Sequence, residues 1–335
     1  MNIREIAEEK EFRTLSPYAS HSRETKGRER KEEECDVRTA FQRDRDRIVH
    51  SKAFRRLKDM TQVFLVAQGD HYRTRLTHTL EVSQIGRTIA RALELNDDLV
   101  EAIALGHDLG HTPFGHAGED ALDQVCPGGF AHYKQSVRVV ELLEKNGQGL
   151  NLTWEVRDGI INHRTAGNPG TLEGQIVRLC DKIAYIHHDM DDAERAGILT
   201  EDDIPITLRI LLGESCKERL NTLIHDIITS SYGKDKVQMS PDIEEGMRLL
   251  RKLMFANVYN NPVTKKEEEK AKRMLQELYV YYSRYPEQMS LEYRQLIKEG
   301  ESVERVVCDY ISGMTDQYSM AKFKEIFVPS GWAIY

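Results

Sequence analysis

Residues 75–119 read RLTHTLEVSQIGRTIARALELNDDLVEAIALGHDLGHTPFGHAGE, and this stretch indicates both the fold and the site. It contains four histidines, and His107 is followed directly by Asp108 in a segment that otherwise has the pattern of an apolar helix. An adjacent His-Asp pair can place a nitrogen and an oxygen ligand on one divalent metal if further ligands come from elsewhere. The stretch therefore predicts helices arranged around a metal site.

His78 is the candidate third ligand. It begins an apolar stripe with the spacing of one helix face, formed by Val82, Ile85, Ile89 and Leu93. The fourth candidate is Asp181, in the helical pattern IVRLCDKIAYIHHDMDD of residues 176–192. Beside its apolar stripe, this segment carries a polar stripe formed by Asp181, Tyr185, His188 and Asp192. A helix with both stripes is what a helical active site requires.

Composition and length exclude several classes of protein. The 335 residues carry a net charge of −8, which argues against a chain devoted as a whole to nucleic acid. No run of 18 apolar residues is present, so we expect no membrane-spanning helix, and the charged N-terminal segment lacks the apolar centre of a signal peptide. The five cysteines are scattered without CxxC spacing, as is typical of reduced thiols. We therefore expect a cytoplasmic enzyme.

The chain divides into three predicted regions. Residues 1–37 form an N-terminal arm, and the low hydrophobicity of its residues 16–36 predicts a segment that is mobile or ordered by oligomer contacts. Residues 38–195 form the core, and residues 196–335 form a C-terminal helical region packed on it. Because the patterns are helical and no strand run is found, the predicted fold is mostly α. Asp98, with Glu101 three residues later, predicts the start of the helix that reaches His107.

Basic residues predominate between Arg38 and Lys58. For Arg43 to Arg47 the favoured interpretation is a solvated helix face. For Arg55 and Arg56, contact with phosphate or with a second subunit competes with that interpretation. The stretch is also the only candidate for a nucleic-acid surface, and its interleaved acidic residues weaken that case.

The order His, His-Asp, distant Asp resembles the HD-domain metal phosphohydrolases. Further blocks extend the resemblance over nearly the whole chain: FRRLKDMTQVF (54–64), RTRLTHTLEVSQIGR (73–87), GHDLGHTPFGHAGE (106–119), HYKQSVRVV (132–140), DKIAYIHHDMDD (181–192) and DYISGMTDQY (309–318). Together they are similar to the deoxyguanosine triphosphate triphosphohydrolase family. The resemblance implies an HD-domain helical bundle with additional C-terminal helices and hydrolysis of deoxynucleoside triphosphates to deoxynucleoside and inorganic triphosphate. It also implies a symmetric homo-oligomer, often a hexamer.

The resemblance also implies roles for individual residues. The metal ligands would be His78, His107, Asp108 and Asp181. Contacts to the phosphates would come from Arg75, His111, His132 and Lys182, and contacts to the sugar from Gln62, Tyr185 and Asp189. Mg²⁺ or Mn²⁺ suits a phosphate substrate, while the two imidazoles equally admit Fe, Co, Ni or Zn.

His116 and Glu119 are the predicted catalytic pair. They lie three residues apart and so share one helical turn. Our hypothesis is that activated water attacks the α-phosphorus, that His116 gives a proton to the leaving 5′-oxygen, and that Glu119 orients the His116 ring. His163 receives no role beyond that of a weak candidate.

Three alternatives stay open at this point. The histidines could be core residues satisfied by backbone, although unpaired buried charge is costly and favours a metal. The site could belong to an HD phosphodiesterase or nucleotidase acting on monophosphates or cyclic nucleotides. The chain could also be a binding protein that senses deoxynucleoside triphosphates, or binds nucleic acid, with little turnover. Base preference and the physiological metal are not determined by the sequence.

Overall fold

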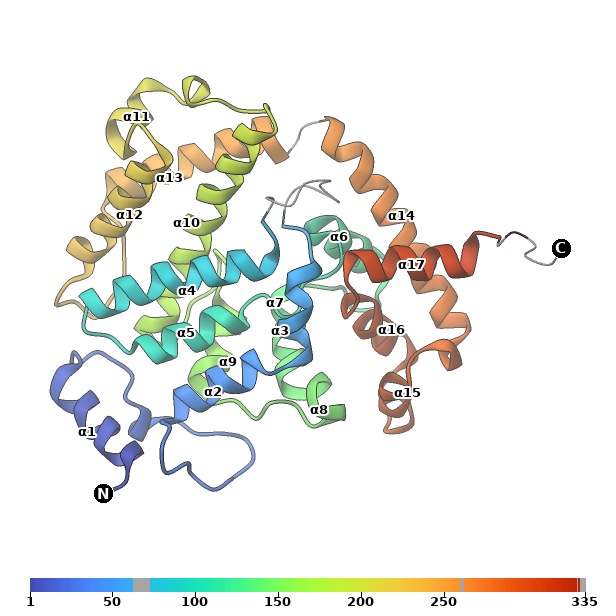
Figure 1. The fold of residues 1–335 in the computed structure, drawn as a ribbon, viewed down its shortest axis with the longest axis horizontal. Coiled ribbons are helices and arrows are strands. Elements are labelled where there is room, and N and C mark those ends of the chain that lie inside the picture. The colour runs from blue at the N-terminus through green and yellow to red at the C-terminus, as the bar shows by residue number, and fades with distance from the viewer. Residues whose placement is uncertain (63–72, 260–261, 330, 332–335) are drawn as a thin grey trace.

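The computed structural model describes residues 1–62, 73–259, 262–329 and 331. Helices make up most of these residues, and the only β-structure among them is two isolated bridges, Arg28 with Thr153 and Thr61 with Thr74. The prediction of a mostly-α fold is confirmed. The chain runs from the N-terminal helix at one corner, through a central group of helices, to a separate C-terminal group (Figure 1).

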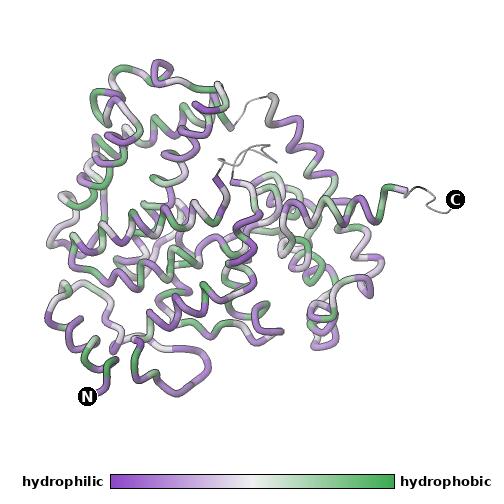
Figure 2. Tube along the Cα trace, viewed as in Figure 1, coloured by the Kyte–Doolittle hydropathy of each residue, from purple (hydrophilic) through white to green (hydrophobic). Residues whose placement is uncertain are grey.

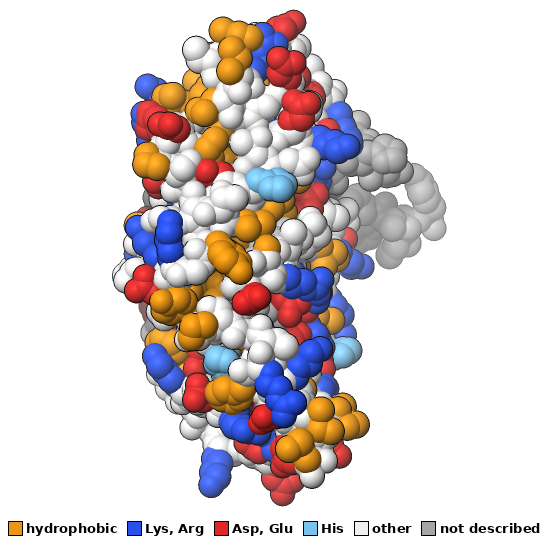
Figure 3. All heavy atoms as spheres, turned by 90° about the vertical axis from the view of Figure 1, so that its left-hand side faces the viewer, with side chains coloured by type: hydrophobic (Ala, Val, Ile, Leu, Met, Phe, Trp, Pro, Cys, Tyr) orange, Lys and Arg blue, Asp and Glu red, His pale blue; other side chains and the backbone are white. Residues whose placement is uncertain are grey.

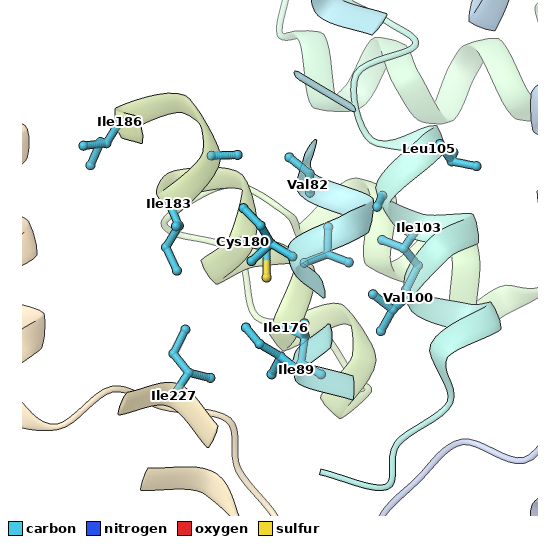
Figure 4. Close-up of a cluster of buried hydrophobic side chains, with 14 of the residues drawn as sticks. Val82, Ile89, Val100, Ile103, Leu105, Ile176, Cys180, Ile183, Ile186 and Ile227 are labelled. Atoms are coloured by element: carbon cyan, nitrogen blue, oxygen red, sulfur yellow. The ribbon is translucent and has the colours of Figure 1, made fainter. Parts of the chain in front are cut away.

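Five helices surround the larger of two hydrophobic cores, which we call the first core. They are α2 (Ala40–Val49), α4 (Arg75–Ala92), α5 (Asp97–Gly106), α9 (Trp154–Asn162) and α10 (Leu172–Arg195). Figure 4 shows apolar side chains of α10 beside those of α4 and α5, among them Ile176, Val82 and Ile103. Each is fully buried, and burying a side chain of this size contributes about 1.5–3 kcal/mol.

The starts of α4 and α5 show how local sequence places the site. Thr74 and Thr77 cap the start of α4 reciprocally, and the predicted inward stripe from His78 through Val82 is buried. The cap of α5 is the side chain of Asn96, which accepts a hydrogen bond from the Leu99 N–H at 3.1 Å. The prediction that Asp98 caps this helix is therefore wrong. Asp98 lies in the first turn, where its negative charge favours the helix dipole.

A second layer covers one side of α10. It consists of α11 (Ile206–Leu212), α12 (Cys216–Ser231) and α13 (Pro241–Met254), followed by a π-helical turn at Phe255–Tyr259. Leu223, Ile227 and Leu250 of this layer are buried and extend the first core. The layer matters for the site because it brings residues 251–259 over the polar stripe of α10.

The C-terminal helices form a second core. It is built from α6 (Gly115–Val125), α14 (Pro262–Arg284), α15 (Leu291–Lys298), α16 (Val303–Ser312) and α17 (Asp316–Phe327). Figure 1 shows α6 beside α14, on the opposite side of the molecule from α11 and α12. Leu122 of α6 and Leu275 of α14 are both fully buried there. Although α6 follows the His-Asp pair closely in sequence, its apolar face belongs to the second core.

The N-terminal arm is held by contacts within its own chain. It begins with α1 (Ile3–Thr14), and the loop that follows reaches the first core. Ser20 donates to Glu173 through its backbone N–H and its hydroxyl, both at 2.9 Å. The Arg28 guanidinium pairs with the buried Asp44. These contacts account for its order without a partner subunit, and ordering by oligomer contacts stays a prediction.

The surface carries charges of both signs. In Figure 2, hydrophilic and hydrophobic residues alternate along the helices, and Figure 3 shows acidic and basic side chains interspersed over one face. In the basic stretch, Arg38 pairs with Asp46, and Arg45 pairs with both Asp46 and Asp98. Arg47, however, is 16% exposed and donates to the carbonyl oxygens of Leu150 and Asn151, so the interpretation of a solvated helix face is wrong for Arg47. Within the described ranges, every helix is too short or too polar to cross a membrane.

Candidate active site

The four predicted metal ligands converge from three helices of the first core. His78 lies on α4, His107 and Asp108 follow the last turn of α5, and Asp181 lies on α10. The distance from His78 Nε2 to Asp181 Oδ1 is 3.2 Å, and that to Asp108 Oδ2 is 3.9 Å. His107 Nε2 lies 3.4 Å from Asp108 Oδ1 and 3.6 Å from Asp181 Oδ1. Residues 103 positions apart in sequence thus share one small volume.

The donor atoms fit a divalent cation. His107 Nδ1 lies 2.6 Å from the Ala104 carbonyl oxygen, so it carries the proton, and Nε2 is left with a free lone pair. His107 Nε2 is buried and has no hydrogen-bond partner among the described residues. Burial lowers the pKa of His107, but the carboxylates of Asp108 and Asp181 outweigh it and raise that pKa to about 9. Two imidazole nitrogens and two carboxylates that favour positive charge match the ligand set of a divalent metal.

Arg75 lies beside the metal ligands. Its side chain is buried one helical turn before His78, and Nη1 donates to Asp108 Oδ2 at 2.8 Å. Burial would raise the pKa of Asp108, but His107 and Arg75 hold it well below the usual range. Arg75 was predicted to contact phosphate, and this contact stays a prediction.

His111, His132 and Glu119 form a second polar group beside the first. The rings of His111 and His132 stack with centroids 4.1 Å apart, and His111 Nε2 lies 3.5 Å from Asp108 Oδ1. Glu119 accepts a hydrogen bond from the His132 backbone N–H at 2.9 Å, and its Oε1 also lies 2.9 Å from His132 Nδ1.

The predicted His116–Glu119 pair is present but shared. His116 Nδ1 lies 3.4 Å from Glu119 Oε2, farther than His132 does. Burial opposes ionisation of Glu119, yet hydrogen bonds from His116 and His132 hold its pKa well below the usual range. The His116 side chain is 82% exposed. Glu119 is thus an ionised carboxylate that orients two imidazoles, one partly buried and one at the surface.

The chain between the His-Asp pair and α6 is tightly turned. Gly110 donates its N–H to Ser136 Oγ at 2.9 Å, and a Cβ at this position would overlap the Ser136 backbone nitrogen. At the entrance to α6, Phe114 and Gly115 have φ angles of 62° and 57°, in the left-handed region. Gly115 lies against the Arg75 guanidinium and the Gln62 backbone carbonyl. The glycines therefore allow the close approach of backbone that assembles the site.

The C-terminal block DYISGMTDQY also holds this turn in place. Asp316 accepts hydrogen bonds from the backbone N–H groups of Phe114 and Thr61, both at 2.9 Å. Arg56 donates to the carbonyl oxygens on either side of the turn, those of Leu109 (2.7 Å) and His111 (3.1 Å).

Arg56 also ties the turn to the C-terminal region. Its guanidinium donates to the carbonyl oxygens of Ser312 and Met314, and burial lowers the pKa of Arg56 to about 10. All four carbonyl groups that accept hydrogen bonds from the Arg56 guanidinium belong to the same chain. These bonds indicate that Arg56 ties the turn to the C-terminal region, and a contact of Arg56 with phosphate or with a second subunit stays a prediction.

The residues predicted to hold the substrate lie along α10 and at Gln62. Lys182 and Tyr185 follow Asp181 on α10, and burial lowers the pKa of Lys182 and raises that of Tyr185 to about 12. Asp189 is buried and accepts a hydrogen bond from the Tyr259 hydroxyl at 2.5 Å. Gln62 is half-buried at the end of a described range. These placements leave the predicted contacts to phosphate and sugar untested.

Three polar residues of the site received no definite role from the sequence, although His188 was counted in the polar stripe and His163 was named as a weak candidate. His188 Nε2 lies 2.8 Å from His78 Nδ1, and Tyr259 reaches Asp189 from beyond α13. His163 is buried with its Nε2 3.3 Å from His132 Nε2, and burial lowers the pKa of His163 to about 4. The polar stripe that contains Asp181 already included His188, but its contact with His78 was not predicted. No pattern in the sequence pointed to Tyr259.

Comparison with known families defines the class of protein. Residues 75–186 match the model of the HD domain, and residues 237–325 match that of the phosphohydrolase-associated domain. The first match contains all four predicted metal ligands, and the HD domain is a metal-dependent phosphohydrolase fold. The chain is thus an HD-domain protein, as the resemblance implied.

Full-length relatives then define the family. A deoxyguanosinetriphosphate triphosphohydrolase-like protein of Caldanaerobacter subterraneus subsp. tengcongensis is 58% identical over 332 residues, covering 99% of this chain and 98% of the relative. Proteins of the same description from Clostridium perfringens and Desulfatibacillum aliphaticivorans are 50% and 48% identical, each aligned over 98% of this chain and over 98% and 99% of their own lengths. The chain belongs to the deoxyguanosinetriphosphate triphosphohydrolase-like family.

Proposed function

We propose that this protein hydrolyses deoxynucleoside triphosphates to deoxynucleoside and inorganic triphosphate. The observation that supports the proposal best is the convergence of His78, His107, Asp108 and Asp181 beside the buried Arg75. Donor atoms for a cation and a guanidinium for a phosphate oxygen lie within one small volume. The membership of the triphosphohydrolase-like family selects triphosphates among phosphate esters.

The reaction adds one water and breaks one bond. A water oxygen bonds to the α-phosphorus, the bond from phosphorus to the 5′-oxygen breaks, and the 5′-oxygen takes up a proton. A divalent metal held by the four ligands would lower the pKa of water and polarise a phosphoryl oxygen. Of the metals named above, Mg²⁺ and Mn²⁺ remain our first candidates.

His116 supplies the proton to the 5′-oxygen in this proposal. The Glu119 carboxylate lies 3.4 Å from His116 Nδ1 and orients the ring, and the exposure of the ring lets it exchange protons with solvent. His132 is partly buried beside the same carboxylate and stacked on the buried His111, so these two imidazoles are better placed to hold phosphate oxygens than to exchange protons with solvent.

Arg75 and Lys182 complete the phosphate contacts. The Arg75 guanidinium now shares its charge with Asp108, and a cation bound to Asp108 would free part of that charge for a phosphate oxygen. Tyr185, Asp189 and Gln62 are assigned to the sugar. An aromatic ring against the 2′ position would clash with a ribose hydroxyl and so select deoxyribose.

Product analysis tests the proposal directly. The protein would be incubated with each of the four deoxynucleoside triphosphates and with GTP, in Mn²⁺ and in Mg²⁺, and the products separated by anion exchange. Equal amounts of deoxynucleoside and triphosphate are expected. Asp108→Ala should abolish both, while Asp191→Asn, a half-exposed carboxylate farther along α10, should retain them.

The other outcomes identify the alternatives. Orthophosphate or pyrophosphate would show cleavage at another bond and would remove the role of His116 as acid to the 5′-oxygen. Linearised cyclic nucleotide would indicate an HD phosphodiesterase. Nucleotide binding without turnover would indicate the sensing protein.

A further inference from the structure

A chain of buried polar groups leads from His78 to the substrate side of the site. His78 presents Nε2 to Asp108 and Asp181, so its other nitrogen, Nδ1, faces away from the ligand cluster. His78 Nδ1 lies 2.8 Å from His188 Nε2. Both residues are fully or almost fully buried, so water does not compete for this contact. The two imidazoles are therefore each other's partners.

The chain continues from His188 to Asp189. His188 Nδ1 lies 2.8 Å from Asp189 Oδ1, an ion-pair contact without hydrogen-bond geometry, and neither atom has a hydrogen-bond partner among the described residues. The approach is bent, as expected for neighbouring side chains on one helix. The other carboxylate oxygen of Asp189 accepts from the Tyr259 hydroxyl at 2.5 Å.

One set of protons is compatible with all three contacts of this chain. If His78 Nε2 is a metal ligand, its Nδ1 carries a proton and donates to His188 Nε2. His188 then carries its own proton on Nδ1, where it faces the Asp189 carboxylate. A histidine that ligates a metal usually donates its second nitrogen to a carboxylate or carbonyl, which fixes the ring and raises its basicity. Here a neutral imidazole lies between ligand and carboxylate.

We propose that His188 is a positioning residue that fixes the tautomer and orientation of the metal ligand His78 and connects this ligand to Asp189 and Tyr259. The proposal rests on the metal site described above. It gives Asp189 a second role, because a group assigned to the sugar would also set the basicity of a metal ligand. A change in the hydrogen bonding of Asp189 should then change the affinity of the site for metal.

Metal affinity, measured without nucleotide, tests this proposal independently of the reaction. Free Mn²⁺ would be followed by electron paramagnetic resonance during titration of the full chain. His188→Leu should weaken Mn²⁺ binding about 10- to 100-fold, the usual effect of removing a partner of a metal ligand. His188→Gln keeps an acceptor near the position of Nε2 and should restore most of the affinity. His187→Leu, at the adjacent half-buried histidine, is the matched control and should leave it unchanged.

A spectroscopic signature separates positioning from general loss of structure. In the Co²⁺-loaded protein, the exchangeable Nδ1 proton of a ligating histidine gives a strongly shifted proton resonance. The His78 proton should be protected from exchange in the parent and in His188→Gln, and lost by exchange in His188→Leu. The resonance of His107, whose Nδ1 proton is held by the Ala104 carbonyl, should persist in all of them.

Tyr259→Phe tests the outer end of the chain. Without the Tyr259 hydroxyl, Asp189 becomes a better acceptor for His188, and Mn²⁺ should bind about two- to fivefold more tightly. When Tyr259→Phe is combined with His188→Leu, this gain in Mn²⁺ affinity should disappear. Equal affinities for the parent and His188→Leu would overturn the positioning role. If His188→Leu does not fold, an unchanged affinity in Tyr259→Phe overturns the connection. Failure of the proposed reaction would instead show in the products while these metal affinities held.

Discussion

The two halves of the candidate site stand on different hydrophobic cores. His78, His107 and Asp181 are carried by or directly follow α4, α5 and α10, which pack together in the first core. His116 and Glu119 are carried by α6, whose apolar face is buried against α14 in the second core. The metal half is therefore fixed mainly by packing within the first core. The position of His116, the proposed proton donor, depends instead on the turn at residues 109–114 and on its ties to Arg56 and Asp316.

The largest effect should come from the metal half. Asp181→Asn removes a charge that faces both His78 and His107 while keeping the shape of the side chain. We expect weaker metal binding and a loss of turnover of about 10³-fold, because metal catalysis contributes several kcal/mol of transition-state stabilisation. Mn²⁺ titration and rates at saturating metal measure the two losses separately. Unchanged metal affinity in this variant would remove Asp181 from the ligand set.

A smaller effect, confined to turnover, should come from the α6 half. Glu119→Gln keeps a hydrogen-bond acceptor but removes the charge that orients His116 and His132. Turnover should fall about 10²-fold, the lower range for a general acid, and Mn²⁺ affinity should not change. Asp120→Asn, at the next residue on α6, is exposed and serves as the control. Loss of metal binding in Glu119→Gln would show that the two halves are not independent.

Substitutions in the hydrophobic core beneath each half of the site should likewise affect metal binding and turnover separately. Leu275 of α14 is fully buried under α6, and Ile103 is fully buried one turn before His107. Truncation of either to alanine should cost about 2–5 kcal/mol of unfolding free energy, measured by denaturant titration. Leu275→Ala should then lower turnover while sparing metal affinity, and Ile103→Ala should weaken metal binding. The same functional loss in both variants would indicate a single cooperative unit.

The elements that the sequence predicted well are those determined by local contacts. The stripe from His78 through Ile89 follows from helical periodicity, and the convergence of the four candidate ligands was anticipated because two histidines and two aspartates in apolar helical patterns need a partner. The start of α5 was misplaced by two residues because Asn96 and Asp98 are both good capping residues. Only the backbone geometry distinguishes them.

The features that sequence reasoning missed depend on how distant elements are placed. The contact between His78 and His188 requires a particular rotation of α10 against α4, which no periodicity specifies. Glu119 lies nearer to His132 than to His116 because of where α7 (His132–Arg138) begins. The burial of Arg56 depends on carbonyl groups more than 250 residues away. Each is a product of tertiary packing rather than of local pattern.

The smallest expected effect is a difference between the alkylation rates of three cysteine thiols. A comparison of these rates shows which hydrophobic core opens first. Cys180, next to Asp181, is buried in the first core, and Cys308 is buried in the second, while Cys35 is half-buried in the arm. Hydrogen bonds from the backbone N–H groups of Arg38 and Val37 lower the pKa of Cys35 to about 7.

Alkylation of Cys35 should therefore be half-maximal near pH 7 and increase as the thiolate forms above that pH. Burial raises the pKa of Cys180, so at pH 8 its alkylation should require opening of the first core. Mass spectrometry of peptides labelled over time gives all three rates. If the halves of the site are independent, Leu275→Ala should accelerate labelling of Cys308 and leave that of Cys180 unchanged, whereas equal acceleration at both thiols would show that the two cores open together.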